Sequence, residues 1–176
     1  SDRGAEAMKL LGAVLLTAAA SVMGFYKARE LKVSQQTLRE ILSLLELMRN
    51  EICTRRTPLK QLFSCSNLPD YRYINGFINE LEAELPSLGS KTFAQIWCES
   101  AEKTLQMLTK SSRQALKDLG SSIGKYDAVL QAASIDRCIS ELNGEYEKLN
   151  EGLKNNEKMC IGLGTGIGLI FAIILV

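Results

Sequence analysis

The chain ends in MCIGLGTGIGLIFAIILV, residues Met159–Val176, and the nature of this stretch decides the fold. A glycine-rich phosphate loop would need a strand before it, a helix after it, and a Lys or Ser/Thr placed to meet the phosphates. The preceding residues, EKLNEGLKNNEK, are polar, and no lysine follows the glycines. A helix of this length rises about 27 Å, which suffices to cross the hydrocarbon core of a bilayer. The sequence therefore predicts a transmembrane helix over residues 159–176.

The glycines of this predicted span lie at every second position, so that pairs of them are four residues apart. Gly162 pairs with Gly166, and Gly164 pairs with Gly168. Glycine at i and i+4 lets the backbones of two membrane helices approach closely. We expect these glycines to pack against another membrane helix, and a second copy of the chain could supply it.

A second apolar run, LLGAVLLTAAASVMGFY at Leu10–Tyr26, also lacks charged residues. The lysine before it and the small residues AAAS within it fit a cleaved signal peptide. Against cleavage, the apolar run continues beyond AAAS, and the basic residues that follow resist translocation. We expect an uncleaved transmembrane helix over residues 9–26. Residues 1–7, SDRGAEA, are left outside the fold as a tag or upstream remnant.

Basic residues flank the middle segment, residues 27–158, at both ends. They are Lys27, Arg29, Lys32, Lys154 and Lys158. Flanks rich in Lys and Arg stay on the cytoplasmic side of a membrane. We therefore expect a cell-membrane protein whose middle domain is cytoplasmic. The alternative is a signal-peptide-bearing envelope protein with an extracytoplasmic helical bundle anchored by its C-terminal helix.

Apolar residues of the middle segment recur at spacings of three and four, the period of a helix buried on one face. No alternating β-branched run predicts a strand. Loop signals divide the segment into about six helices. Their expected ranges are up to Ile52, 58–64, Asp70–Leu85, 91–108, 112–121, and Tyr126 into the second span. The expected fold class is all-α, an antiparallel helical bundle flanked by N- and C-terminal transmembrane helices.

Expectations for several single residues follow from these ranges. Asp70 is expected to cap the third helix, and Tyr73 to lie on the core face of that helix. Trp97 is expected in the core, as are Leu130 and Ala133 of the last helix. The first and last helices lead into the same membrane, so we expect them to lie side by side.

The sequence carries no catalytic constellation. It has no histidine, which removes the commonest general base, the Ser-His pair and most zinc sites. Its five cysteines show no CxxC spacing and fit free thiols in a reducing compartment. We expect no enzyme activity, cofactor or metal, and the net charge of +1 gives no reason to expect nucleic-acid binding.

The stretch DLGSSIGKYDAVLQ, Asp118–Gln131, separates the last two expected helices. Gly120, Gly124, Asp127 and Gln131 have two interpretations. In the first they form a tight helix junction, where Gly124 takes a positive φ and Asp127 caps the next helix. In the second they form a docking corner, where glycines let a partner approach and the polar residues anchor it.

These patterns occur in a recognisable order. KLLGAVLL opens the first span, EICTRRTPL follows at Glu51–Leu59, and Trp97, LGSSIGKYDAVLQ and GLGTGIGLIFAIILV come after it. In this order the chain resembles the stage III sporulation protein AB family of endospore-forming bacteria. The matching positions are Glu51, Thr57, Pro58, Leu59, Trp97, Gly120, Gly124, Asp127 and Gln131.

The resemblance implies a function that spacing alone does not give. Members of that family belong to a multiprotein channel between the mother cell and the engulfed forespore. Their soluble domain is similar to the cytoplasmic helical domains of the inner-membrane F protein of type II secretion. The resemblance thus implies a platform in the mother-cell membrane that engages a cytoplasmic secretion-type ATPase and other channel subunits.

Overall fold

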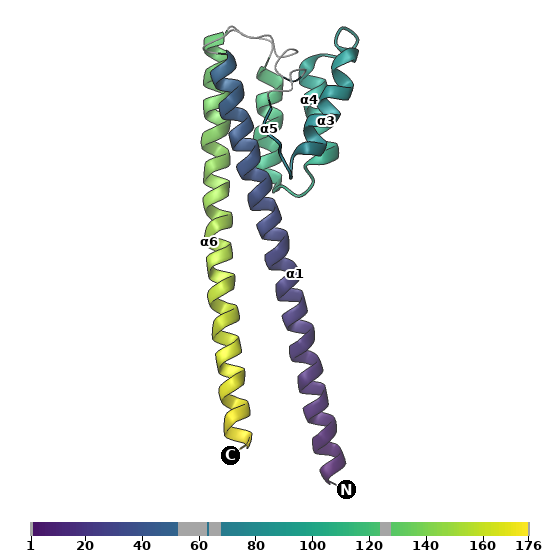
Figure 1. Ribbon diagram of the computed structural model, residues 1–176, viewed down its shortest axis with the longest axis vertical. Helices are drawn as coiled ribbons and strands as arrows, with labels where there is room; N and C mark the ends of the chain where they lie inside the picture. Colours follow the sequence, from purple (N-terminus) through teal and green to yellow (C-terminus); the bar gives the residue numbers. More distant parts are fainter. Residues whose placement is uncertain (1, 53–62, 64–67, 124–127, 176) are drawn as a thin grey trace. The chain divides into compact units, whose positions relative to one another are not determined.

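A computed structural model describes residues 2–52, 63, 68–123 and 128–175. Its helices are α1 (Asp2–Asn50), α3 (Asn75–Glu84), the 3₁₀ helix η2 (Leu85–Ser87), α4 (Phe93–Thr104), α5 (Lys110–Ser122) and α6 (Ala128–Leu175) (Figure 1). Within these ranges there is no strand, only an isolated bridge between Leu88 and Lys91. The predicted all-α class is therefore confirmed for the described residues. The expected helix 58–64 lies outside them, except for Phe63, which is helical.

The chain divides into two compact units, residues 33–150 and residues 1–32 together with 151–176. Among the described residues, no helix is both long enough and apolar enough to cross a bilayer. The backbone of both predicted spans is helical. Most side chains of those spans lie outside the described residues, and so do the surroundings of the four glycines from Gly162 to Gly168.

Within the unit 33–150, α1 and α6 run antiparallel, side by side (Figure 1). Gln35 donates a hydrogen bond from Nε2 to Oδ1 of Asn150 at 3.4 Å, and Arg49 forms an ion pair with Asp136. The two contacts are fourteen residues apart in each helix, from Gln35 to Arg49 in α1 and from Asn150 back to Asp136 in α6. The two helices therefore stay in register between these contacts. The expectation that the first and last helices lie side by side is confirmed for this unit.

The buried residues of both long helices follow a seven-residue repeat. In α1 they include Ser34, Ile41 and Met48, with Thr37, Leu38, Leu44 and Leu45 between them; in α6 they include Ile135, Leu142 and Leu149. This repeat keeps one seam of each helix turned toward its partner. The prediction for Leu130 and Ala133 is wrong: Leu130 is 53% exposed and Ala133 is exposed, because the α6 seam continues backward through Ile135 and Ala132.

Helices α3, α4 and α5 lie beside the α1–α6 pair (Figure 1), and three phenylalanine rings surround Trp97 of α4. Trp97 of α4 is fully buried, and its ring centroid lies 5.0 Å from that of Phe77, 6.0 Å from Phe93 and 6.4 Å from Phe63. The pairs with Phe77 and Phe63 are edge-to-face, an arrangement that adds about 0.5–1.5 kcal/mol each beyond the burial of their area. The prediction that Trp97 is a core residue is confirmed.

The start of α3 corrects another expectation. Asp70 is exposed and does not cap the helix, which begins at Asn75 without any side-chain cap of its own. Instead the Glu40 carboxylate of α1 accepts hydrogen bonds from three backbone N–H groups, those of Arg72, Tyr73 and Ile74, at 3.2, 2.7 and 3.1 Å. This chain path leaves the Tyr73 side chain 38% exposed, so its predicted place on the core face is wrong.

The start of helix α5 is also bound by a carboxylate, which comes from α6. Its N-cap is Thr109, which accepts from the backbone N–H of Ser112. The Thr109 hydroxyl lies 2.9 Å from Oε2 of Glu145 in α6. Hydrogen bonding to Lys148 first, and to Thr109 as well, lowers the pKa of Glu145. One carboxylate from each long helix therefore fixes the start of an inserted helix.

Candidate functional site

The structure separates the sequence-predicted site residues into three groups. Thr57, Pro58, Leu59, Gly124 and Asp127 lie outside the described residues. Glu51 and Gln131 are both half-buried and both interact with other groups, so neither stands out as an exposed anchor. Gly120 is buried in α5.

Gly120 packs directly against Trp97. A Cβ built on Gly120 would lie 3.1 Å from Cγ and 3.2 Å from Nε1 of the indole, and closer still to Cδ1. The indole is fixed in place, because its Nε1–H donates to the carbonyl oxygen of Leu116 at 2.9 Å. Gly120 thus serves the close approach of α4 to α5, which favours a packing role over a docking role for this glycine.

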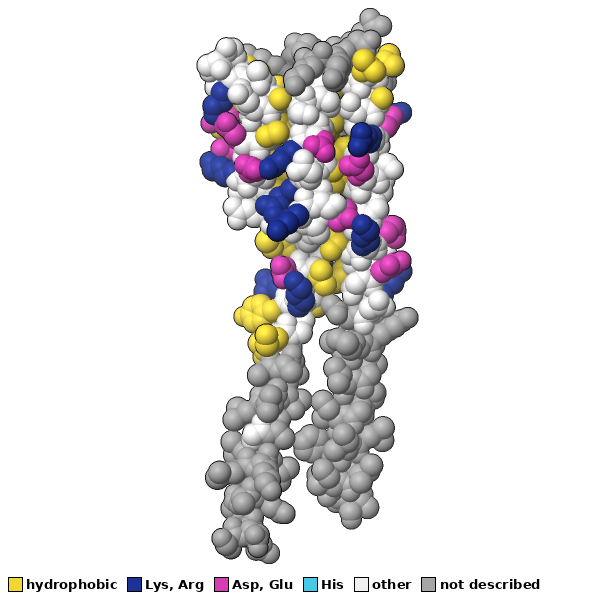
Figure 2. All heavy atoms as spheres, turned by 180° about the vertical axis from the view of Figure 1, so that it is seen from behind, with side chains coloured by type: hydrophobic (Ala, Val, Ile, Leu, Met, Phe, Trp, Pro, Cys, Tyr) yellow, Lys and Arg dark blue, Asp and Glu magenta, His cyan; other side chains and the backbone are white. Residues whose placement is uncertain are grey.

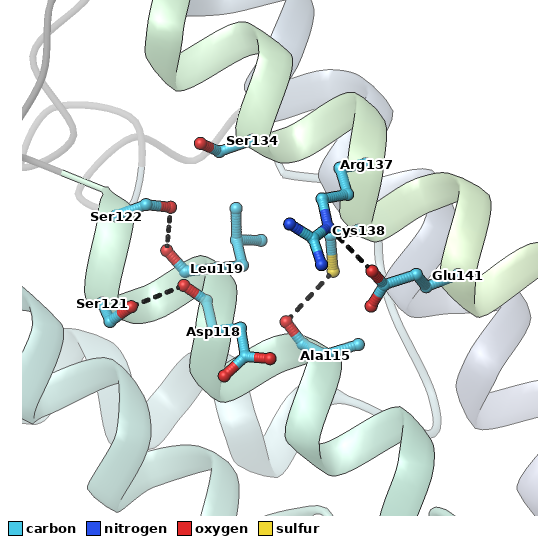
Figure 3. Close-up of a pocket in the computed structure, with 9 residues that line it drawn as sticks. All are labelled: Ala115, Asp118, Leu119, Ser121, Ser122, Ser134, Arg137, Cys138 and Glu141. Carbon is cyan, nitrogen blue, oxygen red and sulfur yellow. Dashed lines mark hydrogen bonds and ion pairs between the residues drawn. The ribbon is translucent and has the colours of Figure 1, made fainter.

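A pocket of about 270 Å³ lies next to this contact, between the C-terminal half of α5 and the first turns of α6 (Figure 3). Asp118, Ser121 and Ser122 approach it from α5, and Ser134, Arg137 and Glu141 from α6. Ala115, Leu119 and Cys138 supply apolar lining.

The hydroxyl groups of the pocket have already donated their hydrogens. Ser121 donates to the carbonyl oxygen of Asp118 at 2.7 Å, and Ser122 to that of Leu119 at 2.8 Å. Ser134 donates to the carbonyl oxygen of Leu130 at 3.0 Å. A hydroxyl oxygen has two lone pairs in addition to its one hydrogen. All three oxygens can therefore only accept a bond from a ligand in this arrangement.

The charges of the pocket are two carboxylates and one guanidinium. Arg137 donates from Nε to Oε1 of Glu141 at 2.9 Å, and Gln114 donates to Oδ1 of Asp118 at 2.8 Å. The pKa of Arg137 is raised, mainly by the Glu141 bond and in a smaller part by the charge of Asp118. The local field therefore favours positive charge.

The thiol in the pocket is poorly suited to act as a nucleophile. Cys138 is buried and its Sγ lies 3.6 Å from the carbonyl oxygen of Ala115. Burial raises the pKa of Cys138 to about 12, so the thiolate is scarce at neutral pH. Among the described residues, no group of three or more Cys, Asp or Glu could hold a metal ion.

Sequence reasoning found only one side of this pocket. Asp118, Ser121 and Ser122 lie within the stretch that was singled out, but Arg137 and Glu141 lie on the next helix. The available signal was the pair Arg137 and Glu141 four residues apart, with Ser134 one turn before, on one face of a predicted helix.

The sequence matches one family of known proteins over nearly its whole length. The sequence model of the family "Stage III sporulation protein AB" matches residues 9–176. The Stage III sporulation protein AB of Bacillus subtilis (strain 168) is 26% identical over 174 residues, which cover 96% of this chain and 99% of that protein. A solved structure of Stage III sporulation protein AB shares the fold with a TM-score of 0.53 and 21% identity, over 69% of this chain and 97% of that chain. The match over nearly the whole length shows that this chain belongs to the stage III sporulation protein AB family.

Proposed function

We propose that this sporulation protein is a membrane-anchored platform subunit of a secretion-like channel between mother cell and forespore. In this role the helical unit 33–150 lies in the mother-cell cytoplasm and engages a secretion-type ATPase and other channel subunits. Family membership supports the sporulation role directly. The platform role rests on an exposed apolar turn of α1, on the charged residues that follow it, and on the way the inserted helices are held.

The observation that carries the proposal is one turn of α1 whose exposed side chains are all apolar or aromatic and uncharged. Val22, Met23, Phe25 and Tyr26 are 55, 75, 70 and 68% exposed. At about 100° per residue these four positions cover about 160° of the helix surface. Gly24 lies on the opposite side of the helix and has no side chain. Apolar side chains gather at the end of the described part of α1 in Figure 2. A soluble helix keeps a polar face, so this turn fits a lipid environment.

The character of α1 changes abruptly after this turn. Lys27, Arg29, Glu30 and Lys32 are all exposed, and Lys27 forms an ion pair with Glu30 at 3.0 Å. Aromatic residues followed by basic ones are typical of the cytoplasmic boundary of a membrane helix. Positive charges there also attract anionic lipid headgroups.

The unit 33–150 fits a platform because its helices are held at defined ends. Glu40 of α1 binds the backbone just before α3, and Glu145 of α6 binds the N-cap of α5. A force applied to α3 or α5 by a partner is therefore passed to the long helix that holds it. The exposed surface of the described helices carries interspersed charges of both signs (Figure 2). Such a surface suits specific polar contacts with protein partners.

A lipid-depth measurement tests the membrane claim. A nitroxide label is placed at Met23→Cys in the full-length chain with its native cysteines replaced, reconstituted in lipid nanodiscs. The matched control is Val129→Cys, because Val129 is 76% exposed and Met23 is 75% exposed. We expect the label at position 23 to be more accessible to oxygen than to a polar nickel chelate, and the label at position 129 to show the reverse. Equal accessibility profiles would refute the lipid location.

Two further measurements test the remaining parts. Mass spectrometry of the chain from native membranes should show residues before Lys27 still attached, whereas cleavage near AAAS would favour the envelope alternative. Gly124→Leu and Asp127→Ala should leave the chain in the membrane but reduce its co-purification with the ATPase and block sporulation. Wild-type co-purification together with normal sporulation in both variants would count against docking at this corner.

A further inference from the structure

We infer that the α5–α6 pocket is a receptor for an arginine side chain of a partner protein. The pocket is lined by Asp118, Ser121, Ser122, Ser134, Arg137 and Glu141 around the apolar floor of Ala115, Leu119 and Cys138. The inference rests on the proposed platform role only in assigning the arginine to a partner, and the chemistry of the pocket stands by itself.

The hydrogen-bond inventory decides the class of ligand. The three serine hydroxyls offer acceptors only, because each has donated its hydrogen to a carbonyl of its own helix. Asp118 and Glu141 each use one carboxylate oxygen in the side-chain bonds described above, to Gln114 and to Arg137, which leaves Asp118 Oδ2 and Glu141 Oε2. The only donors left in the lining are the terminal amino groups of Arg137. A ligand that takes the place of the Arg137 head must therefore bring donors, and a guanidinium brings five in one plane.

The charge of the pocket points the same way. Two carboxylates and one guanidinium give the lining a net charge of −1. Arg137 itself shows how a guanidinium sits there: in Figure 3 its head points into the space between Leu119 and Glu141. Its side chain is 81% exposed, so it can move aside at little cost. Arg137 is thus an intramolecular competitor for the incoming group.

The shape of the pocket favours a protein ligand over a free cation. The methylene stem of an arginine can cover Leu119 and Cys138 while its head stays in the polar rim. A single net negative charge at an exposed site strengthens binding by no more than about fivefold. Useful affinity therefore needs further contacts around the arginine, which a partner surface on α5 and α6 can supply and a small cation cannot.

The test uses the full-length chain in detergent micelles and a short probe, the peptide Ac-Gly-Ser-Gly-Arg-Gly-Ser-Gly-NH₂. Its matched control carries citrulline in place of arginine, which has the same shape without the charge. Backbone and Arg Nε signals are followed by NMR during titration. We expect saturable shifts confined to residues 115–122 and 134–141, with a Kd on the order of millimolar for one side chain. Citrulline should bind at least about fivefold more weakly.

Variants separate a cation site from an anion site. Arg137→Ala removes the competitor and should strengthen binding of the arginine probe about two- to fivefold. Asp118→Asn and Glu141→Gln should weaken it, while Glu102→Gln on α4, away from the pocket, should not. Loss of binding in Arg137→Ala, or equal shifts with citrulline or glutamate peptides, would overturn the inference.

Two outcomes concern the identity of the occupant. If the same signals shift with protein concentration when no peptide is present, a second copy of this chain fills the pocket, and the assignment to another protein fails. If the probe binds as expected but the lipid-depth measurement gives no difference between positions 23 and 129, the pocket stands and the membrane platform fails. The two claims are therefore tested independently.

Discussion

Replacing Gly120 with alanine tests the contact on which the α4–α5 interface is built. The new Cβ would approach Cγ and Nε1 of Trp97 to 3.1 and 3.2 Å, and Cδ1 more closely, whereas ordinary contact begins at 3.4 Å. Two contacts oppose a shift of the indole ring away from the new Cβ. Phe77 lies edge-on to it at 5.0 Å, and its Nε1–H is bound to the Leu116 carbonyl.

The size of the effect follows from three contributions. Alanine in a helix interior is favoured over glycine by about 1 kcal/mol. Overpacking a filled core costs about 1–3 kcal/mol. Breaking the indole hydrogen bond would leave a buried N–H without a partner, which costs about 1–3 kcal/mol more. We expect Gly120→Ala to lower the free energy of unfolding by about 1–5 kcal/mol, against the helix propensity of the substitution.

The assay is thermal and urea unfolding of the full-length chain, followed by circular dichroism. The matched control is Gly144→Ala, because a Cβ at Gly144 meets nothing within 4 Å and should stabilise α6 by about 0.5–1 kcal/mol. The double variant with Trp97→Phe should lose less than the sum of the single variants, since the smaller ring makes room. A neutral or stabilising Gly120→Ala, or strict additivity with Trp97→Phe, would refute the packing argument.

Other predictions concern the two carboxylate contacts and the buried thiol. Glu40→Gln should lower the free energy of unfolding by about 1–2 kcal/mol, because three N–H groups lose a charged acceptor, while Glu46→Gln at an exposed position of α1 should have little effect in the same unfolding assay. The lowered pKa of Glu145 means that its contribution is present above its unfolded pKa near 4.5 and is lost as the pH falls. The stability difference between wild type and Glu145→Gln, about 1 kcal/mol at neutral pH, should therefore shrink as the pH falls below 4.5, and a constant difference would contradict this. Because the pKa of Cys138 is about 12, its alkylation at pH 8 should be at least about 100-fold slower in the folded chain than in urea, as measured by mass spectrometry.

The sequence predicted the helices and most of their buried faces because apolar spacing reports burial directly. Phe93, Ile96, Trp97, Ala101 and Leu105 are buried as their spacing indicates. The expected break between the helices Asp70–Leu85 and 91–108 is also confirmed, since Pro86 lies in the short helix η2 and Gly89 adopts a φ of +119°. That backbone region is readily open only to glycine.

The contacts between distant segments could not be predicted in this way. The backbone just before α3 is bound by Glu40, more than thirty residues earlier, and α3 has no side-chain cap, so the prediction that Asp70 caps it is wrong. Gly120 looked like a junction residue, but its neighbour Trp97 lies on another helix. The pocket needs Arg137 and Asp118 from two helices to meet, and one sequence without a structure does not show which faces meet.

The most direct test of the account is the side of the membrane on which the helical unit lies. Single cysteines are placed at Ser140, an exposed position of α6, and at Ala5, before the first predicted span, in the full-length chain with its native cysteines replaced. Intact protoplasts that produce these chains are treated with a membrane-impermeant maleimide. The account predicts that Ala5→Cys is labelled at once and Ser140→Cys only after permeabilisation. Labelling of Ser140→Cys in intact protoplasts would place the unit outside the cytoplasm and contradict it.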